Sequence, residues 1–175
     1  MRPEDNGAVV YLGVGSNLGD REANLAAAAA ALGQVDGVRV RRKSRLYDTL
    51  AVGPQQPRFL NAAWEVTSTL APRRLLSALQ RVEQALGRSG KGLQLPRTVD
   101  LDVLLWGERI LVEPDLQIPH PEMHRRRFVL EPLAELAPEA RHPVLGLTVR
   151  MLLQALPAGD VSPLQQQAHA SLAKP

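Results

Sequence analysis

Residues 96–106 read Pro-Arg-Thr-Val-Asp-Leu-Asp-Val-Leu-Leu-Trp, and β-favouring residues dominate from Val99 onward. We therefore predict a strand over residues 99–106. Side chains at positions i and i+2 of a strand lie on the same face, so Asp100 and Asp102 are expected to be neighbours. The opposite, buried face is expected to consist of Val99, Leu101, Val103 and Leu105.

The spacing of the two aspartates suits a pair of metal ions. Two strand steps of about 3.3 Å put their Cβ atoms roughly 6–7 Å apart, so the carboxylates can converge on cations about 3.5–4 Å apart. Mg²⁺ prefers a few carboxylates together with phosphate oxygens and water. Arg97, just before the pair, fits a polyphosphate bridged between metal and guanidinium. The alternative is an edge strand whose charges discourage aggregation.

Basic segments on both sides of this strand extend the same pattern. Residues 88–96 form a basic loop in which Arg88 and Lys91 would add positive charge over the site if the loop closes. The alternative is a solvated basic loop. On the other side, His120 precedes three consecutive arginines at 125–127. These residues could gather imidazole and guanidinium groups around phosphates.

The first half of the chain predicts a strand, a helix and a second strand. Residues 8–14 form an apolar, β-favouring run that stops at a glycine-rich turn, and Asp20 is a plausible N-cap for an alanine-rich helix that Gly33 ends. Residues 38–47 alternate, which predicts a strand with a basic wet face. Residues 48–58 contain glycine and proline without periodicity and are expected to form a long, functional loop.

The remaining elements follow from similar patterns. A strand is expected over 59–70, where Phe59 and Asn61 could cover and read a flat heterocycle or could simply be core residues. Pro72 should open a helix that ends at Gly87 and carries Gln80 and Glu83 on its polar face. A short turn and return over 107–113, helices around 128–136 and 147–156, and a disordered tail over 157–175 complete the prediction.

Strands and helices in this order, without steady βα alternation, favour an α+β fold. The 175 residues suit a single domain, expected over residues 8–156. The glycines at 13, 15 and 19 do not fit the dinucleotide pattern G-x-G-x-x-G, and no Walker A pattern occurs. If ATP binds, it must therefore use another architecture.

Composition narrows the possible partners and compartment. Hydrophobic residues make up 45% of the chain, there is no cysteine, and no apolar stretch is long enough to span a bilayer. We therefore expect a cytoplasmic protein that does not bind membranes. The basic residues are arginines except for Lys43, Lys91 and Lys174, which suits phosphate contacts or reflects a compositional bias. The few aromatic residues argue against nucleic-acid binding.

Several of these segments together resemble the 6-hydroxymethyl-7,8-dihydropterin pyrophosphokinases of folate biosynthesis. The resemblance covers residues 9–156. It rests on Gly15-Ser-Asn-Leu-Gly, Gly53-Pro-Gln, Phe59-Leu-Asn-Ala-Ala, Gln80-Arg-Val-Glu83, Pro96-Arg-Thr-Val-Asp-Leu-Asp, and Pro119-His with Met123 and Phe128. The sequence departs from many members at Gln94-Leu95, which replaces Trp-Gly, at Pro121 after His120, and at Phe59 in place of a tyrosine.

The resemblance implies a ferredoxin-like α+β sheet with helices packed on its faces, and transfer of pyrophosphate from ATP to the pterin hydroxymethyl oxygen. We expect the protein to be a monomer. Asp100 and Asp102 would bind two Mg²⁺ ions. ATP would be contacted by Arg97, His120, Gln80, Glu83, Arg126 and Arg88. The pterin would be contacted by Thr49, Val52, Phe59, Asn61 and Phe128. The rival interpretation is a non-catalytic ferredoxin-like module that binds a ligand or a nucleic acid.

Overall fold

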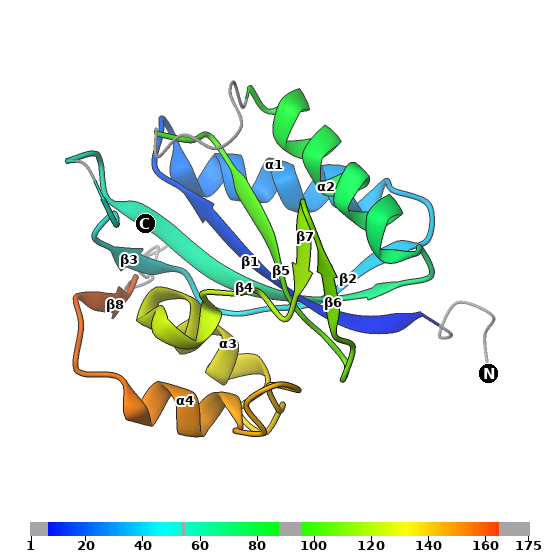
Figure 1. Cartoon of the computed structure of the whole chain (residues 1–175). Coiled ribbons are helices and arrows are strands. Elements are labelled where there is room, and N and C mark those ends of the chain that lie inside the picture. The colour runs from blue at the N-terminus through cyan, green and yellow to red at the C-terminus, as the bar shows by residue number, and fades with distance from the viewer. Residues whose placement is uncertain (1–6, 54, 88–95, 165–175) are drawn as a thin grey trace, which may run out of the picture.

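The structure, a computed structural model, describes residues 7–53, 55–87 and 96–164. A mixed set of strands and helices forms one layered unit (Figure 1). In chain order the elements are β1 Ala8–Ser16, α1 Arg21–Gly33, β2 Val38–Lys43, β3 Tyr47–Thr49, β4 Phe59–Ser68, α2 Pro72–Ala85, β5 Asp100–Trp106, β6 Leu111–Glu113, β7 Leu116–Ile118, a 3-10 helix Met123–Arg125, α3 Arg127–Leu136, α4 Val149–Ala155 and β8 Val161–Pro163.

The main sheet has six strands, and all its pairings are antiparallel. Its order is β5-β1-β4-β3-β8, and β2 also pairs with β4. The predicted α+β class is confirmed, because consecutive strands are not joined by regular helical crossovers. β1 lies between β4 and the acidic strand β5, so the first strand of the chain is an interior strand of the sheet.

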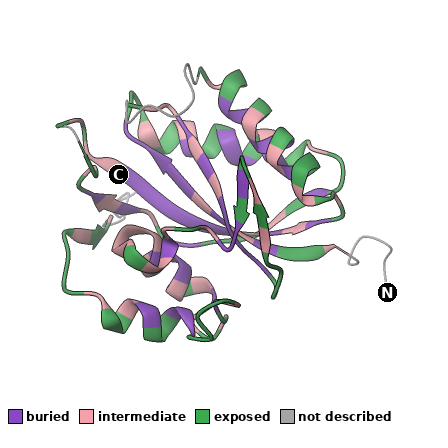
Figure 2. Ribbon diagram, viewed as in Figure 1, coloured by how far each residue is buried: buried purple, intermediate pink, exposed green. Residues whose placement is uncertain are grey.

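Helices cover both faces of this sheet (Figures 1 and 2). α1 and α2 pack on one face, where Val10, Leu12 and Val14 alternate inward from β1. α3 and α4 pack on the other face against a smaller cluster of buried side chains, which comprises Ala63, Leu104, Leu105, Met123, Leu130, Leu133, Val149 and Leu152. Two cores on opposite faces explain why β1, β4 and β5 are largely buried.

β5 contains an irregularity that the alternating pattern did not predict. Leu12 pairs with Val103 but Tyr11 pairs with Leu105, so one extra residue is inserted in β5 at this point. A bulge of this kind reverses the alternation of the side chains that follow it. The prediction that Leu105 shares a face with Val103 is therefore wrong: Leu105 joins the α3–α4 core, and Trp106 lies in the other.

The predicted strand over 38–47 is interrupted. β2 ends at Lys43 and β3 begins at Tyr47, and both pair with β4. Ser44 lies at the break, where its hydroxyl donates to the carbonyl of Arg45 and accepts from the backbone N–H of Ala63. At this position the Ser44 hydroxyl accepts the hydrogen bond of a β4 backbone N–H. Regular backbone pairing with β4 stops here, so the predicted strand is divided into two.

α2 begins and ends as predicted, with Pro72 in its first turn and Gly87 just beyond it at a φ of 92°. Its polar face differs from the prediction. Glu83 is only 4% exposed, because its carboxylate accepts a hydrogen bond of 2.7 Å from the backbone N–H of Leu101. Leu101 lies in β5 between Asp100 and Asp102, so Glu83 fastens α2 to the edge of the acidic strand.

Two connections also differ from the sequence prediction. β6 does not return along β5; it pairs with β7 in a separate two-stranded sheet, because the partner strand comes later in the chain. Residues 161–163, expected to lie in a disordered tail, form β8 and pair with β3. Within the described residues, no helix combines the length and the apolar character that crossing a membrane requires.

Candidate active site

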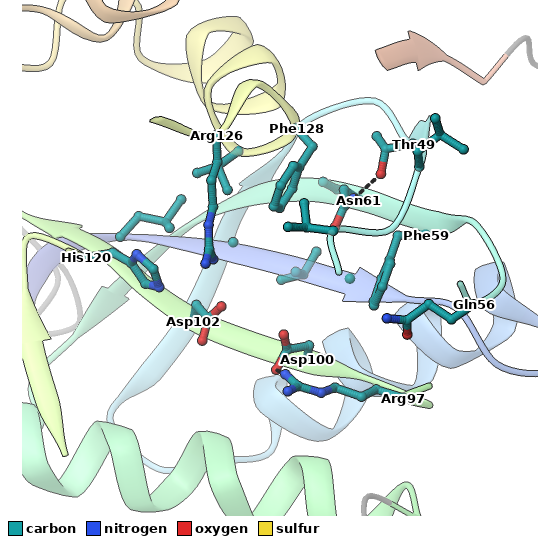
Figure 3. Close-up of a pocket in the computed structure, with 18 residues that line it drawn as sticks. Thr49, Gln56, Phe59, Asn61, Arg97, Asp100, Asp102, His120, Arg126 and Phe128 are labelled. Carbon is teal, nitrogen blue, oxygen red and sulfur yellow. Dashed lines mark hydrogen bonds and ion pairs between the residues drawn. The ribbon is translucent and has the colours of Figure 1, made fainter. Parts of the chain in front are cut away.

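A pocket opens on the face of the sheet that α3 partly covers, and β1 forms its floor (Figure 3). The space between its walls is about 930 Å³ when the open mouth is included. The side chains around it come from segments far apart in the sequence. Those with chemical potential are Thr49, Gln56, Phe59, Asn61, Arg97, Asp100, Asp102, His120, Arg126 and Phe128.

Strand register explains how these groups meet. Gly13 and Gly15 of β1 lie opposite Asp102 and Asp100 of β5, and Gly15 lies opposite Asn61 of β4 on its other side. Directly opposed residues of an antiparallel pair share a face. Asn61, Gly15 and Asp100 therefore form a row across three strands. The glycines leave the middle of the row without side chains, and this opens space for a ligand.

The acidic pair occupies one end of the pocket. Both carboxylates line it, and the Arg97 guanidinium lies 2.8 Å from the Asp100 carboxylate. Asn17 holds the segment just before β5 in place. Its side-chain oxygen accepts a hydrogen bond from the Arg97 backbone N–H at 2.7 Å, and its backbone N–H donates to the Arg97 carbonyl. The glycine-rich turn after β1 thus positions the arginine beside the acidic pair.

Asp102 lies in a strongly unfavourable environment for a negative charge. Burial, followed by the nearby charges of Asp100 and Glu83, raises the pKa of Asp102 to about 7. Arg97 and Arg126 counteract this shift only in part. A bound cation would reduce the repulsion between these closely spaced, buried carboxylates.

The donor set fits Mg²⁺ as a shared ligand of protein and substrate. Within the described residues, no group of three or more His, Cys, Asp or Glu side chains could enclose a metal by itself. Asp100 and Asp102 together offer carboxylate oxygens and leave room for others. Mg²⁺ is typically held by one or two carboxylates, with phosphate oxygens and water completing its octahedron.

His120 adds an oriented, neutral imidazole. Its backbone N–H donates to the Leu104 carbonyl at 2.9 Å, and its Nδ1 accepts from the Glu122 N–H at 3.1 Å. Burial and then the charge of Arg126 lower the pKa of His120 to about 4. The ring is neutral at physiological pH, and because Nδ1 is an acceptor, the hydrogen is on Nε2. It can donate to an oxyanion.

The other end of the pocket combines an oriented amide with two aromatic rings. Asn61 is 9% exposed, and its side-chain nitrogen donates to the Thr49 hydroxyl at 2.7 Å. The rings of Phe59 and Phe128 point into the pocket near this amide (Figure 3). The Arg126 guanidinium lies 5.8 Å from the centre of the Phe128 ring, between the aromatic end and the acidic end.

Most of the residues selected from the sequence therefore meet in this pocket, Val52 among them. Gln80 and Glu83 do not line it, although Glu83 lies close enough to influence Asp102. Arg88 and Lys91 lie outside the described residues. Sequence reasoning missed Gln56, which accepts from the Asn17 side chain at 3.0 Å, and treated Gly13 and Gly15 only as a failed dinucleotide pattern. Gly13 and Gly15 are two residues apart on a predicted strand and therefore share a face. This spacing could have identified them as the open floor of a pocket.

Comparison with known proteins agrees with this geometry. Residues 11–138 match the family model for 7,8-dihydro-6-hydroxymethylpterin-pyrophosphokinase (HPPK). A protein named 2-amino-4-hydroxy-6-hydroxymethyldihydropteridine pyrophosphokinase from Synechocystis is 41% identical over 159 residues, 91% of this chain and 80% of that protein. A protein of the same name from Pseudomonas aeruginosa is 43% identical over 149 residues, 85% of this chain and 91% of that protein.

Solved structures show the same fold at low identity. An HPPK-DHPS in complex with substrates has a TM-score of 0.64 at 13% identity, covering 85% of this chain and 43% of that chain. The HPPK-DHPS of Plasmodium falciparum with pteroate has a TM-score of 0.66 at 15% identity, covering 88% and 43%. This chain spans less than half of those longer chains. From the family match and the relatives, the chain belongs to the 7,8-dihydro-6-hydroxymethylpterin-pyrophosphokinase family.

Proposed function

We propose that this protein transfers pyrophosphate from ATP to the hydroxymethyl oxygen of 6-hydroxymethyl-7,8-dihydropterin and releases AMP. One observation carries the proposal: a single pocket joins an acidic pair flanked by Arg97 and His120 to an oriented amide flanked by two aromatic rings. The first end suits a metal-bound triphosphate, and the second suits a planar heterocycle with hydrogen-bonding edges. The named relatives support the same activity.

The acidic end would neutralise and position the phosphates. Asp100 and Asp102 would hold two Mg²⁺ ions, which would supply charge neutralisation and orientation for the triphosphate. Arg97 and Arg126 would contact phosphate oxygens through their guanidinium groups. The neutral His120 would donate from Nε2 without adding a charge that Arg126 would oppose. Such positioning and electrostatics are most of what phosphoryl-type transfer requires.

In the proposed reaction the pterin hydroxyl oxygen forms a bond to the β-phosphorus of ATP. The bond between this phosphorus and the oxygen that bridges to the α-phosphorus breaks, and AMP leaves with that oxygen. The hydroxyl proton passes to solvent water as the new bond forms. The chain needs no covalent nucleophile for this step, in agreement with its lack of cysteine and with a pocket composed of carboxylates, donors and rings.

The pterin end would recognise the heterocycle by its edge and its faces. Asn61 would hydrogen-bond the edge, while Phe59 and Phe128 would pack against the ring. Thr49 would fix the Asn61 amide through the bond they share, and Val52 would cover the pocket from the loop that follows β3. The oriented amide would distinguish a pterin from an apolar ring of the same size.

The proposal extends to three further residues selected from the sequence. Gln80, Glu83 and Arg88 would contribute to the ATP site, and Glu83 would do so partly through β5, which it holds. The first part of the chain runs β1-α1-β2-β3-β4-α2-β5. With β2 and β3 counted as one interrupted strand, it follows the β-α-β-β-α-β order of ferredoxin-like folds, and this order supports a ferredoxin-like core. We also propose that the enzyme acts as a monomer.

The decisive assay measures AMP. Purified protein, ATP and 6-hydroxymethyl-7,8-dihydropterin should give AMP at a rate that depends on both the pterin and Mg²⁺. A non-catalytic binding module would give none. The proposal fails if a folded sample, checked by circular dichroism, forms no pterin-dependent AMP at saturating Mg²⁺.

Gly15→Ala tests the pterin end. A Cβ at this position would lie 2.7 Å from Asn61 Oδ1 and 3.4 Å from Phe59 Cδ1, so the amide must turn away from its present orientation. Losing one buried hydrogen bond to the substrate costs about 1–3 kcal/mol, and we expect the KM for pterin to rise roughly ten- to a hundredfold. Gly33→Ala is the matched control, because its Cβ would meet nothing within 4 Å. Equal pterin KM values for the two variants would contradict this role of the glycine.

A further inference from the structure

The C-terminal strand β8 is the neighbour of a strand that carries a pocket residue. It pairs with β3 so that Val161 lies opposite Thr49 and Ser162 opposite Asp48. The pairing continues where the Leu164 N–H donates to the Leu46 carbonyl at 2.7 Å. Thr49 in turn accepts the hydrogen bond that orients the Asn61 amide. β8, an edge strand far from β3 in the sequence, therefore helps to fix the position of Thr49, which lines the pocket.

Arg58 links β8 to both ends of the loop between β3 and β4. Its Nε donates to the carboxylate of Asp48 in β3, just before the loop. Its Nη1 lies 2.7 Å from the carboxylate of Asp160, just before β8. Arg21 at the start of α1 reinforces the same place: one of its nitrogens lies 3.2 Å from Asp48, and the other donates to the Arg58 carbonyl at 3.1 Å. The Arg58 guanidinium also lowers the pKa of Asp160.

The loop fastened in this way forms one wall of the pocket. Leu50, Val52 and Gln56 line it, and Leu50 and Val52 remain 58% and 60% exposed. These apolar side chains are held near the pocket mainly by the course of their backbone, because they are not packed into either core. The attachment of the loop ends therefore determines where this wall stands.

We propose that Arg58 is a positioning residue for pterin binding, and that Asp160, just before β8, acts through it to hold Leu50, Val52 and Gln56 at the pterin end of the pocket. The inference rests on the proposed function and adds to it a part of the chain that follows the matched family region, residues 11–138. It assigns a role to the segment after α4, whose described residues do not line the pocket.

The solvent exposure of the Arg58–Asp160 ion pair indicates that it positions the loop and does not stabilise the whole fold. The Arg58 and Asp160 side chains are 40% and 49% exposed, and ion pairs this open to solvent contribute little to the stability of a fold. The loop can open locally at a much smaller free-energy cost than unfolding of the whole protein. Weak ion pairs at its ends can therefore decide how often its apolar side chains are in place when the substrate binds. Breaking the links should therefore weaken pterin binding while the fold and the ATP end remain.

The test is a double-mutant cycle on Arg58→Gln and Asp160→Asn. We expect the pterin KM to rise about three- to tenfold in Arg58→Gln and less in Asp160→Asn. The double variant should match Arg58→Gln, because Asp160 acts through the residue already changed. The KM for ATP, kcat and the melting temperature should stay near wild-type values, and Arg58→Lys should recover part of the loss. Glu139→Gln is the control: its carboxylate pairs with Arg150 on an exposed surface outside the pocket.

Amide hydrogen exchange gives a second readout that does not require activity. Exchange in peptides covering residues 47–60 should become faster in Arg58→Gln and Asp160→Asn and stay unchanged in Glu139→Gln. Unchanged exchange and unchanged pterin KM would overturn the inference, as would a parallel loss of ATP affinity and melting temperature, which would indicate a purely structural role. An inactive wild-type protein would instead count against the proposed function, and the exchange data would still decide the role of Arg58.

Discussion

Replacing Asp100 and Asp102 together by alanine is expected to abolish Mg²⁺-dependent ATP binding and to reduce AMP formation by at least about 10³-fold, because metal-ion stabilisation of a phosphoryl-type transition state is worth several kcal/mol. Both carboxylates line the pocket, and the described residues offer no third acidic or imidazole group to complete a metal site. Isothermal titration with ATP and a non-reactive ATP analogue, with and without Mg²⁺, measures the loss directly.

The control must remove the same charge elsewhere. Asp36→Ala with Glu108→Ala removes two exposed carboxylates that do not line the pocket, so the net charge of the protein changes equally. We expect this variant to bind the Mg²⁺ complex of ATP as the wild type does. If the Asp100/Asp102 double variant kept Mg²⁺-dependent binding, the acidic pair would be an edge-protecting feature, and the assignment of the metal site would be wrong.

The acidic pair could be predicted because it depends on local periodicity alone. Asp100 and Asp102 are two residues apart on a strand, and the bulge that disturbs β5 comes only after them. The helix ends at Asp20 and Pro72 were predictable for the same reason, since capping and proline geometry act within one turn. The face of Leu105 was not, because an inserted residue in a pairing depends on the partner strand.

Features that depend on distant partners were beyond the sequence pattern. Glu83 occupies a position of helical periodicity that predicts a polar face, and its burial follows only from the Leu101 N–H that it accepts. β8 is short and lies in a segment of low apolar periodicity, so its strand conformation depends on pairing with β3. The pocket residues were recognised by resemblance more than by physics, because the row formed by Asn61, Gly15 and Asp100 requires the register of three strands.

Asp102→Asn should have opposite effects on function and on stability. The substitution keeps the size of the side chain and removes a negative charge that burial, Asp100 and Glu83 all disfavour. We expect AMP formation to fall sharply, because an amide binds Mg²⁺ poorly. We expect the Mg²⁺-free protein to gain about 2 kcal/mol of unfolding free energy at pH 8, which corresponds to roughly 4–8 °C in melting temperature for a chain of this size.

The pH dependence of that gain follows from the direction of the shift. The Asp102 pKa rises from 3.8 to about 7 on folding, so the folded state holds this proton more tightly than the unfolded state does. The wild-type protein should therefore lose unfolding free energy as the pH rises from about 4 to about 7, whereas Asp102→Asn lacks this contribution. Melting curves in chelator at pH 5 and pH 8 should show a larger difference between the two proteins at pH 8.

Adding Mg²⁺ with a non-reactive ATP analogue should reverse the order of stability, because the cations turn the crowded carboxylates of the wild type into ligands and leave the variant with little to bind. The wild type should then melt at the higher temperature. If Asp102→Asn were instead less stable than the wild type at pH 8 in chelator, the negative charge of Asp102 would be satisfied within the protein. The acidic pair would then have no need of a cation, and the central electrostatic argument for the metal site would fail.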